Sequence, residues 1–201
     1  MSCEISAGRS VSCKDASGGI KGVYILNFVD TLTANMVIQT PANPVVHGDN
    51  LKVVSMNSGE DAGLSVYYFQ LRREMASLDI NVNSSPENGT TFFEQQLVVN
   101  FNKFSVSDAD KAKILSYGRP QIIVEDNQSN LILLGAANGM DVSSGSISTG
   151  QAFGDRNGVS LTFTGREVEP YFELVGDTSA PASPAPSPFE NFEAADITIA
   201  T

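Results

Sequence analysis

The stretch SLDINVNSSPENGTTFFEQQLVVNFNKF, residues 77–104, alternates apolar and polar side chains in two consecutive segments. Leu78, Ile80 and Val82 occupy alternate positions of the first segment, and Phe93, Leu97, Val99 and Phe101 do the same in the second. A period of two is typical of β-strands with one buried face and one solvated face. The polar side chains that we expect on the solvated face are Asp79, Asn81, Asn83, Glu94, Gln96, Asn100 and Asn102. From the pattern alone, an ordinary solvated sheet face is the simpler explanation.

Length and charge limit the classes of protein that the chain can be. Its 201 residues suit one domain, and a hydrophobic share of 41% suffices for a core. The formal net charge is -11, from 12 basic and 23 acidic residues, which disfavours nucleic-acid binding through phosphate contacts. The tail after Arg166 contains no basic residue and is strongly acidic, whereas the preceding body is nearly balanced.

Targeting signals and cysteine spacing give further expectations. No apolar run approaches the roughly 20 residues of a membrane helix, and the start MSCEIS lacks the basic and apolar regions of a signal peptide. We therefore expect no membrane span and synthesis in a cytoplasm. Cys3 and Cys13 match no zinc spacing and are expected to be free thiols, although a disulfide between them is compatible with their number.

The chain divides into four segments by composition. Residues 1–21 form an N-terminal arm rich in Ser, Gly and Ala, and residues 22–175 form a β-patterned domain. Residues 176–188 are a Pro-rich linker, expected to be extended. Residues 189–201 are a C-terminal tail motif whose alternating DITI segment either adds a strand to a neighbour or remains disordered.

Within the β-patterned domain, apolar runs and turn residues place the elements. A Ser-Asp-Ala-Asp start and a Gly-Arg-Pro end predict one helix over residues 107–117. Residues 140–149 are small and polar, with glycines that mark bends or close approaches. The predicted strands are residues 22–28, 51–56, 64–73, 77–83, 93–102, a hairpin of 121–124 with 131–134, 159–163, and 169–175 beside the last. Many short strands predict an all-β, antiparallel β-sandwich or small barrel with one short flanking α-helix.

No catalytic motif accompanies these elements. His47 is the only imidazole and lies in a loop without a Gly-x-Ser-x-Gly elbow, so we interpret it as a loop residue. Two acidic pairs, Glu125 with Asp126 and Glu60 with Asp61, flank turns, and no third ligand follows at a recognisable spacing. Phosphate-binding glycine loops are absent. We expect no catalytic activity, no cofactor and no metal.

From residue 97 to 174 the order of motifs is familiar. A strand ending in NFNKF (100–104) precedes the helix, and the QIIVED (121–126) and LILLG (131–135) pair follows it. GMD (139–141), STGQAFGDRNG (148–158) and LTFTGREVEP (161–170) complete the order. This half of the chain resembles the tail tube proteins of tailed bacteriophages, particularly small structural proteins of phages that infect Bacteroidota.

The resemblance implies a tail-tube-like fold that assembles into stacked hexameric rings. In such rings, inner strands of six subunits close into a barrel around a lumen that conducts DNA. The seven polar residues named above would line this lumen and repel phosphate without binding it. The turn 84–89, the loop 57–63 and the N-terminal arm would contact neighbouring rings. The implied partners are further copies of the chain, passing DNA and other tail proteins (sheath, neck or baseplate), in a virion assembled in the host cytoplasm.

Three alternatives stay open from the sequence. A neck, capsid-decoration or baseplate protein of a phage could share the fold without a closed lumen. A carbohydrate or cell-surface binding module could use Tyr67, Tyr68 and Phe69 as stacking rings, although the chain has no tryptophan and adjacent strand residues face opposite sides. A metal-assisted hydrolase would require the carboxylates of Glu125, Asp126 and Asp155 to converge.

Overall fold

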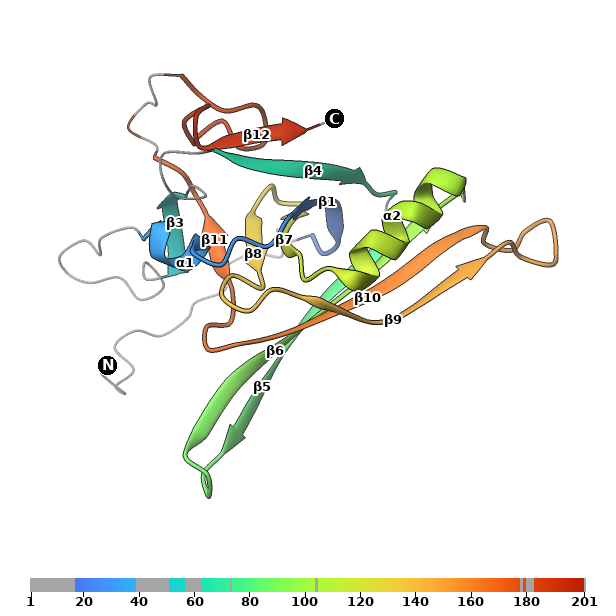
Figure 1. The fold of residues 1–201 in the computed structure, drawn as a ribbon, viewed down its shortest axis with the longest axis horizontal. Coiled ribbons are helices and arrows are strands. Elements are labelled where there is room, and N and C mark those ends of the chain that lie inside the picture. The colour runs from blue at the N-terminus through green and yellow to red at the C-terminus, as the bar shows by residue number, and fades with distance from the viewer. Residues whose placement is uncertain are drawn as a thin grey trace.

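The computed structural model describes residues 17–38, 51–56, 63–72, 74–103, 105–177, 179 and 183–200. The described chain is mostly β-strand, with two sheets and two helices, so the prediction of an all-β fold is confirmed at that level (Figure 1). Most of the N-terminal arm, with Cys3 and Cys13, lies outside the described residues. The same holds for His47, for Glu60 and Asp61, and for nearly all of the loop 57–63.

The larger sheet has eight strands in the order β12-β4-β1-β7-β8-β11-β3-β2. Two pairings are parallel, β11 with β3 and β12 with β4, so a wholly antiparallel arrangement is wrong at these two places. Both pairs join segments more than a hundred residues apart, which allows the long connection that a parallel pair needs. The strands are β1 (Ile20–Leu26), β2 (Val37–Ile38), β3 (Lys52–Ser55), β4 (Leu64–Gln70), β7 (Gln121–Asp126), β8 (Leu131–Leu134), β11 (Phe172–Leu174) and β12 (Ile197–Ala200).

The smaller sheet is antiparallel throughout, in the order β5-β6-β10-β9. Its strands are β5 (Ala76–Ser85), β6 (Thr90–Asn102), β9 (Asp141–Ser148) and β10 (Gly158–Glu167). Strand β9 was not predicted, because its small polar residues give little apolar signal. Figure 1 shows the β5–β6 and β9–β10 hairpins projecting from the body in different directions.

The predicted pairing of residues 169–175 beside 159–163 is wrong. Strand β10 already has β6 on one side and β9 on the other, so neither of its edges is free. Residues 172–174 form β11 instead, which pairs with β8 and β3 in the larger sheet.

Two apolar clusters lie on opposite sides of the larger sheet. In its central strands β1 and β7, alternate residues point to opposite faces and nearly all of them are buried. Val23 and Val124 belong to a cluster with Leu97 and Phe163 of the smaller sheet, so this cluster joins the two sheets. Tyr24, Leu26 and Ile123 belong to the second cluster, which includes Phe189, Phe192 and Ile197 of the C-terminal segment.

The C-terminal segment 183–200 is part of this chain's own fold. Strand β12 adds to the edge of β4, and the ring of Phe189 lies with its centroid 5.0 Å from that of Tyr24. Ala185 donates its backbone N–H to Phe192 O at 2.8 Å, which holds the end of the Pro-rich segment against the tail. The tail motif therefore adds a strand, as one of the two predictions has it, and the sheet it joins is that of the same chain.

Helix α2 (Val106–Tyr117) confirms the predicted helix, and a short α1 (Leu32–Asn35) was not predicted. Ala112 of α2 is buried in the cluster between the sheets, whereas Ile114 and Tyr117 are exposed. Across the described ranges, neither helix has the length and apolarity needed to cross a bilayer.

Candidate functional site

The structure brings the seven polar residues predicted from residues 77–102 onto one face of the smaller sheet. Asp79 lies opposite Gln96, and Asn81 lies opposite Glu94. Directly opposed residues of an antiparallel pair point to the same side of the sheet, and so do residues two apart in one strand. Asn83, Asn100 and Asn102 are therefore on this side too, and none of the seven is buried. We call this side of the smaller sheet the polar face.

Strands β10 and β9 extend the polar face to the far edge of the sheet. Ser160 lies opposite Asn100 on one side and Ser146 on the other, and Thr162 lies opposite Ser144. The hydroxyl residues of this half are Ser144, Ser146, Ser148, Ser160, Thr162 and Thr164. Sequence reasoning did not assign them to the face, although the alternation of residues 158–166 carried the same period-two signal as β5 and β6.

Two side chains interrupt the polar character. Phe92 lies opposite Asn83, and Val98 lies opposite Ser77 and Thr162. The guanidinium carbon of Arg166 is 5.9 Å from the centroid of the Phe92 ring, so an exposed cation covers part of that apolar surface.

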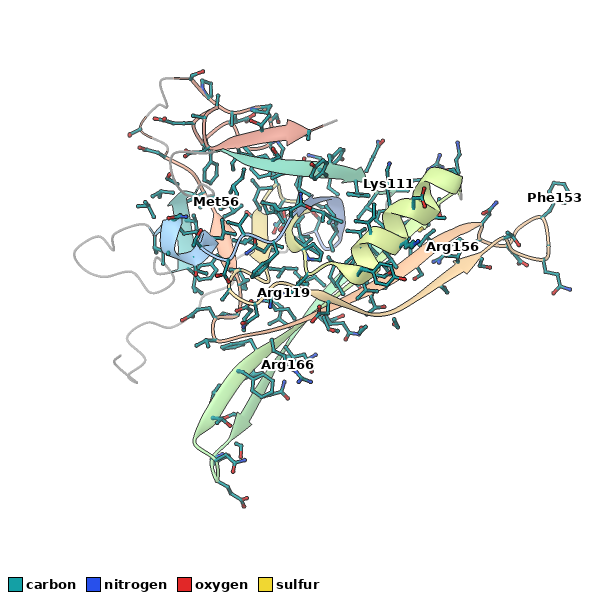
Figure 2. All side chains as sticks on the ribbon, viewed as in Figure 1. Met56, Lys111, Arg119, Phe153, Arg156 and Arg166 are labelled. Carbon is teal, nitrogen blue, oxygen red and sulfur yellow. The ribbon has the colours of Figure 1, made fainter. Side chains whose placement is uncertain are left out.

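Arginines reduce the negative charge that β5 and β6 alone would give the face. Arg166 Nη2 lies 3.3 Å from Glu94 Oε1, and the Arg166 side chain is largely exposed. Such an exposed pair contributes about 1 kcal/mol or less to stability. Arg156 Nη1 donates to Asn100 Oδ1, and Ser160 Oγ donates to the same oxygen at 2.7 Å. Figure 2 labels both arginines, one toward each end of the sheet.

The opposite face of the same sheet is core. Leu97, Val99 and Phe163 have no exposed surface there. Gln95 shares this face and is buried, yet both ends of its amide are satisfied. Its Nε2 donates to Pro170 O at 2.8 Å, and its Oε1 accepts from Gly135 N at 2.8 Å. A buried amide with both partners ties the loops after β8 and β10 to β6.

Glu167 ends β10 as a second buried polar residue on the core face. Its Oε1 accepts from the backbone N–H groups of Ala137 at 3.1 Å and of Asn138 at 2.7 Å. Burial raises the pKa of this carboxyl, and the two backbone donors offset part of the rise.

We expect Glu167 to make the protein more stable at acidic than at neutral pH, relative to Glu167→Gln. When a carboxyl has a higher pKa in the folded than in the unfolded state, its protonation stabilises the fold. This stabilisation is complete at a pH below the pKa in the unfolded state, about 4.3. That stabilisation is lost as the pH rises through the folded value. Urea unfolding of both proteins between about pH 4 and pH 7 measures the difference in unfolding free energy. A difference that stays constant with pH would contradict the assignment.

The acids considered as catalytic candidates have separate structural partners. Glu125 is buried and accepts hydrogen bonds from Lys21 Nζ and from Tyr24 OH, the latter at 3.2 Å. Asp126 Oδ1 accepts from Gln128 N and Asn130 N, both at 2.8 Å, and so fixes the β7–β8 turn. Asp155 binds backbone N–H groups in the β9–β10 loop. Among the residues that the structure describes, no three His, Cys, Asp or Glu side chains gather into a metal-binding group.

The three aromatic residues of β4 do not form one stacking surface. Tyr67 and Tyr68 are adjacent and therefore point to opposite faces. The Tyr68 ring lies 4.8 Å from that of Tyr24, and the Phe69 ring lies 5.5 Å from that of Phe101, measured between centroids. These packing contacts account for two of the three rings.

Comparison with known proteins gives no assignment. No family model matches the chain, and neither a curated protein nor a solved structure matches it. The candidate site is therefore defined by its own geometry, as a four-stranded sheet with one core face and one solvated face that is polar apart from Phe92 and Val98.

Proposed function

We propose that this chain is a non-enzymatic structural subunit of a bacteriophage tail tube, built as a tail-tube-like β-sandwich. In the tube, the smaller sheets of several copies, six by the resemblance described above, join edge to edge with their polar faces inward. The observation that carries the proposal is the continuity of the polar face across all four strands. The wall of a water-filled bore requires such a face, which the solvated side of a sheet in a monomer would also provide.

The directions of the strands are compatible with such a ring. Neighbours in the smaller sheet are antiparallel, so the first strand, β5, and the fourth, β9, run in opposite directions. When cyclic symmetry places β5 of one copy beside β9 of the next, that new pair is antiparallel as well. Both strands are edges of the sheet in the described part of the chain. Joining them removes two exposed edges per copy.

The edges are also staggered along the strand direction. Strand β5 pairs with residues 90–99 of β6, whereas β9 pairs with residues 158–164 of β10, which lie opposite residues 96–102 of β6. A closed barrel requires tilted strands and a stagger of this kind. The stagger of the sheet is compatible with closure.

Strand spacing relates the number of copies to the width of the bore. Six four-stranded sheets with strands about 4.8 Å apart have a circumference of about 115 Å and a backbone diameter of at least about 37 Å. Three copies would give only about 18 Å, which side chains on the inner face would nearly fill. Six copies leave room for duplex DNA.

The chemistry of the polar face suits passage of DNA without binding. Most of its side chains are hydroxyls and amides, and its three acids, Asp79, Glu94 and Asp141, outnumber the two arginines, Arg156 and Arg166. Phosphate recognition requires clustered Lys and Arg, since cation release from the duplex supplies most of the affinity. Basic side chains gather only at one end of the face, where Arg72, Lys103 and Arg156 line a hollow with Asn100 and Asn102. We expect DNA to slide along the rest of the face.

We expect Asp79→Lys combined with Glu94→Lys to preserve assembly and to slow DNA delivery. The pair changes the charge of the bore by +4 per copy and creates repeated phosphate contacts. The measurements are electron microscopy of the assemblies, salt-dependent retention of DNA by purified tubes, and the rate of DNA ejection from virions. Glu190→Lys combined with Glu193→Lys is the matched control, because it makes the same charge change on exposed residues of the C-terminal segment.

Two outcomes separate the parts of this proposal. Purified protein that shows neither rings nor tubes by sedimentation and microscopy would contradict the assembly. Tubes that form normally but eject DNA at the same rate with both lysines present would contradict the assignment of the polar face to the bore. A monomer that binds glycans would favour the carbohydrate-binding module instead.

A further inference from the structure

Three basic side chains gather in one hollow at the end of the smaller sheet where β6 ends and β10 begins. Arg72, Lys103 and Arg156 line this hollow, which has a volume of about 590 Å³. We call it the basic hollow. Its volume lies in the range of small-molecule binding sites. The remaining lining residues are Gln70, Leu71, Asn100, Asn102, Asp155 and Asn157.

The turn into β10 carries Arg156 to the end of β6. Gly158 pairs with Asn102, and a Cβ on Gly158 would lie 2.0 Å from Phe101 O, so this approach requires glycine. The Arg156 side chain, labelled in Figure 2, donates from Nη1 to Asn100 Oδ1, which positions the guanidinium beside the polar face. This bond uses only one of its N–H donors, so the others can bind a ligand.

Arg72 reaches the basic hollow from the end of β4 in the larger sheet. Leu71, directly before it, is buried. A few residues further on, Asn100 N donates to Met75 O at 2.8 Å, which ties this part of the chain to β6. The backbone is therefore held on both sides of Arg72, while Arg72 itself is exposed.

Lys103 has a left-handed backbone conformation, with φ of 67°. A side chain with a Cβ adopts this conformation at a cost that glycine avoids and that asparagine reduces. Lys103 N donates to Asn157 O at 2.8 Å, so the turn explains the backbone conformation but not the presence of a lysine. Residues in such sparsely populated conformations cluster at binding sites, where they position a functional group.

The described residues leave the basic hollow with an excess of positive charge. Arg72, Lys103 and Arg156 form no ion pair among them. Asp155 is the only acid of the described lining, and its carboxylate accepts from the backbone N–H groups of Ala152 at 2.7 Å and Gln151 at 2.9 Å. These donors hold the pKa of Asp155 below its usual value. Repulsion among three cations destabilises the empty hollow, and a bound anion removes that repulsion.

We propose that the basic hollow is a binding site for a phosphate group. The two guanidinium groups offer paired N–H donors that match phosphate oxygens, and Lys103 adds a point charge. The site goes beyond the proposed function, because it is complete within one copy and needs no ring. The phosphate group belongs either to a small molecule, such as a nucleotide, or to the backbone of DNA that reaches this end of the polar face.

Two single variants of the full-length chain test the site. We expect Lys103→Asn and Arg72→Gln each to weaken the binding of inorganic phosphate and of adenosine monophosphate by at least about tenfold, because each removes a charge-assisted contact. Lys103→Asn should melt at the same temperature as the unaltered protein or higher, since asparagine tolerates the left-handed backbone. Weaker binding without loss of stability separates a ligand contact from a structural role. Isothermal titration calorimetry measures the affinity, and circular dichroism melting measures the stability.

Lys113→Gln is the matched control. It removes one exposed cation of α2 that does not line the basic hollow, so phosphate should bind as it does to the unaltered protein. Equal weakening in the control, or unchanged affinity in both Lys103→Asn and Arg72→Gln, would overturn the proposal. So would an unaltered protein that binds no phosphate compound, or one that binds poly-glutamate in their place.

A short duplex oligonucleotide distinguishes the two sources of the phosphate group. Adenosine monophosphate that binds at least as tightly as the duplex, with both lost in the two variants, supports the site and assigns it to a small molecule. A duplex that binds at least about tenfold more tightly, with an affinity that falls as salt rises and depends on the same two residues, supports the site and assigns it to DNA. Sedimentation measures ring assembly separately, so failure of the phosphate site is distinguishable from failure of the tube.

Discussion

Deleting residues 183–201 should abolish cooperative folding of the isolated chain. The deletion removes β12 from the edge of β4 and takes Phe189, Phe192 and Ile197 out of the core, where each is at most 2% exposed. Truncating one buried phenylalanine to alanine costs about 3–5 kcal/mol, and truncating a buried isoleucine costs about 2–5 kcal/mol. The combined loss is on the order of 10 kcal/mol, comparable with the whole stability of a domain. Loss of the cooperative thermal transition and gain of dye-accessible apolar surface would show it.

A single substitution gives a graded version of the same test. Phe189→Ala should lower the unfolding free energy by about 3–5 kcal/mol, because the cavity borders Tyr24 in the apolar cluster that contains the C-terminal segment. For a chain of this length the melting temperature should fall by roughly 10 °C. Phe153→Ala removes the same side chain from a fully exposed site and should change stability by about 0.5 kcal/mol or less. Equal effects of the two substitutions would contradict the docking of the C-terminal segment.

Replacing Ile147 by proline should block ring formation and leave the subunit folded. Lys103 N donates to Asn157 O at 2.8 Å, so odd-numbered residues of β10 bond to β6 and even-numbered residues face β9. Ser146 lies opposite Ser160, and its N–H therefore points into the sheet, whereas the N–H of Ile147 points outward from the edge. Ile147 is 53% exposed, so a proline there disturbs little packing. It removes a donor that the β5 edge of the next copy needs.

The matched variants make this result interpretable. Ile147→Thr keeps the N–H and the β-branched shape, so rings should form as before. Ser146→Pro removes an N–H that serves the subunit's own sheet and should lower its thermal stability. Sedimentation velocity measures ring formation, and circular dichroism melting measures the fold. Rings that persist with Ile147→Pro would exclude the β9 edge as the joint between neighbouring subunits.

Patterns of neighbouring residues in the sequence predicted those helices and strands whose buried and exposed side chains follow a regular period. The alternation in residues 77–102 placed β5 and β6, and the seven polar residues do share one side of the sheet. On the other side Leu97 and Val99 are buried, whereas Val82 is 64% exposed. Helix α2 followed from its cap residues and from the Gly-Arg-Pro stop. The β7–β8 hairpin followed from two apolar runs around a polar turn.

Long-range pairing decided the features that the sequence did not predict. Strand β9 is rich in serine and glycine and so lacks the apolar alternation that predicts a strand. Its position in the sheet depends on its pairing with β10. Residues 172–174 had the pattern of a strand, and the sequence placed them beside β10. The structure excludes that place because β6 and β9 occupy both edges of β10, so the residues join the larger sheet instead. Gln95 breaks the apolar alternation of β6, and its burial is explained only by partners 40 and 75 residues away. Arg166 likewise joins the polar face from a strand distant in sequence.

The parallel pairing of β12 with β4 has a kinetic consequence. It joins residues 64–67 to residues 197–200, so this contact closes one of the longest loops in the chain and should form late. Until it forms, β4 presents an unpaired edge beside the still vacant place of Phe189. Because the same segment of a second molecule can pair with that edge, we expect newly made, crowded molecules to misfold by exchanging their C-terminal segments.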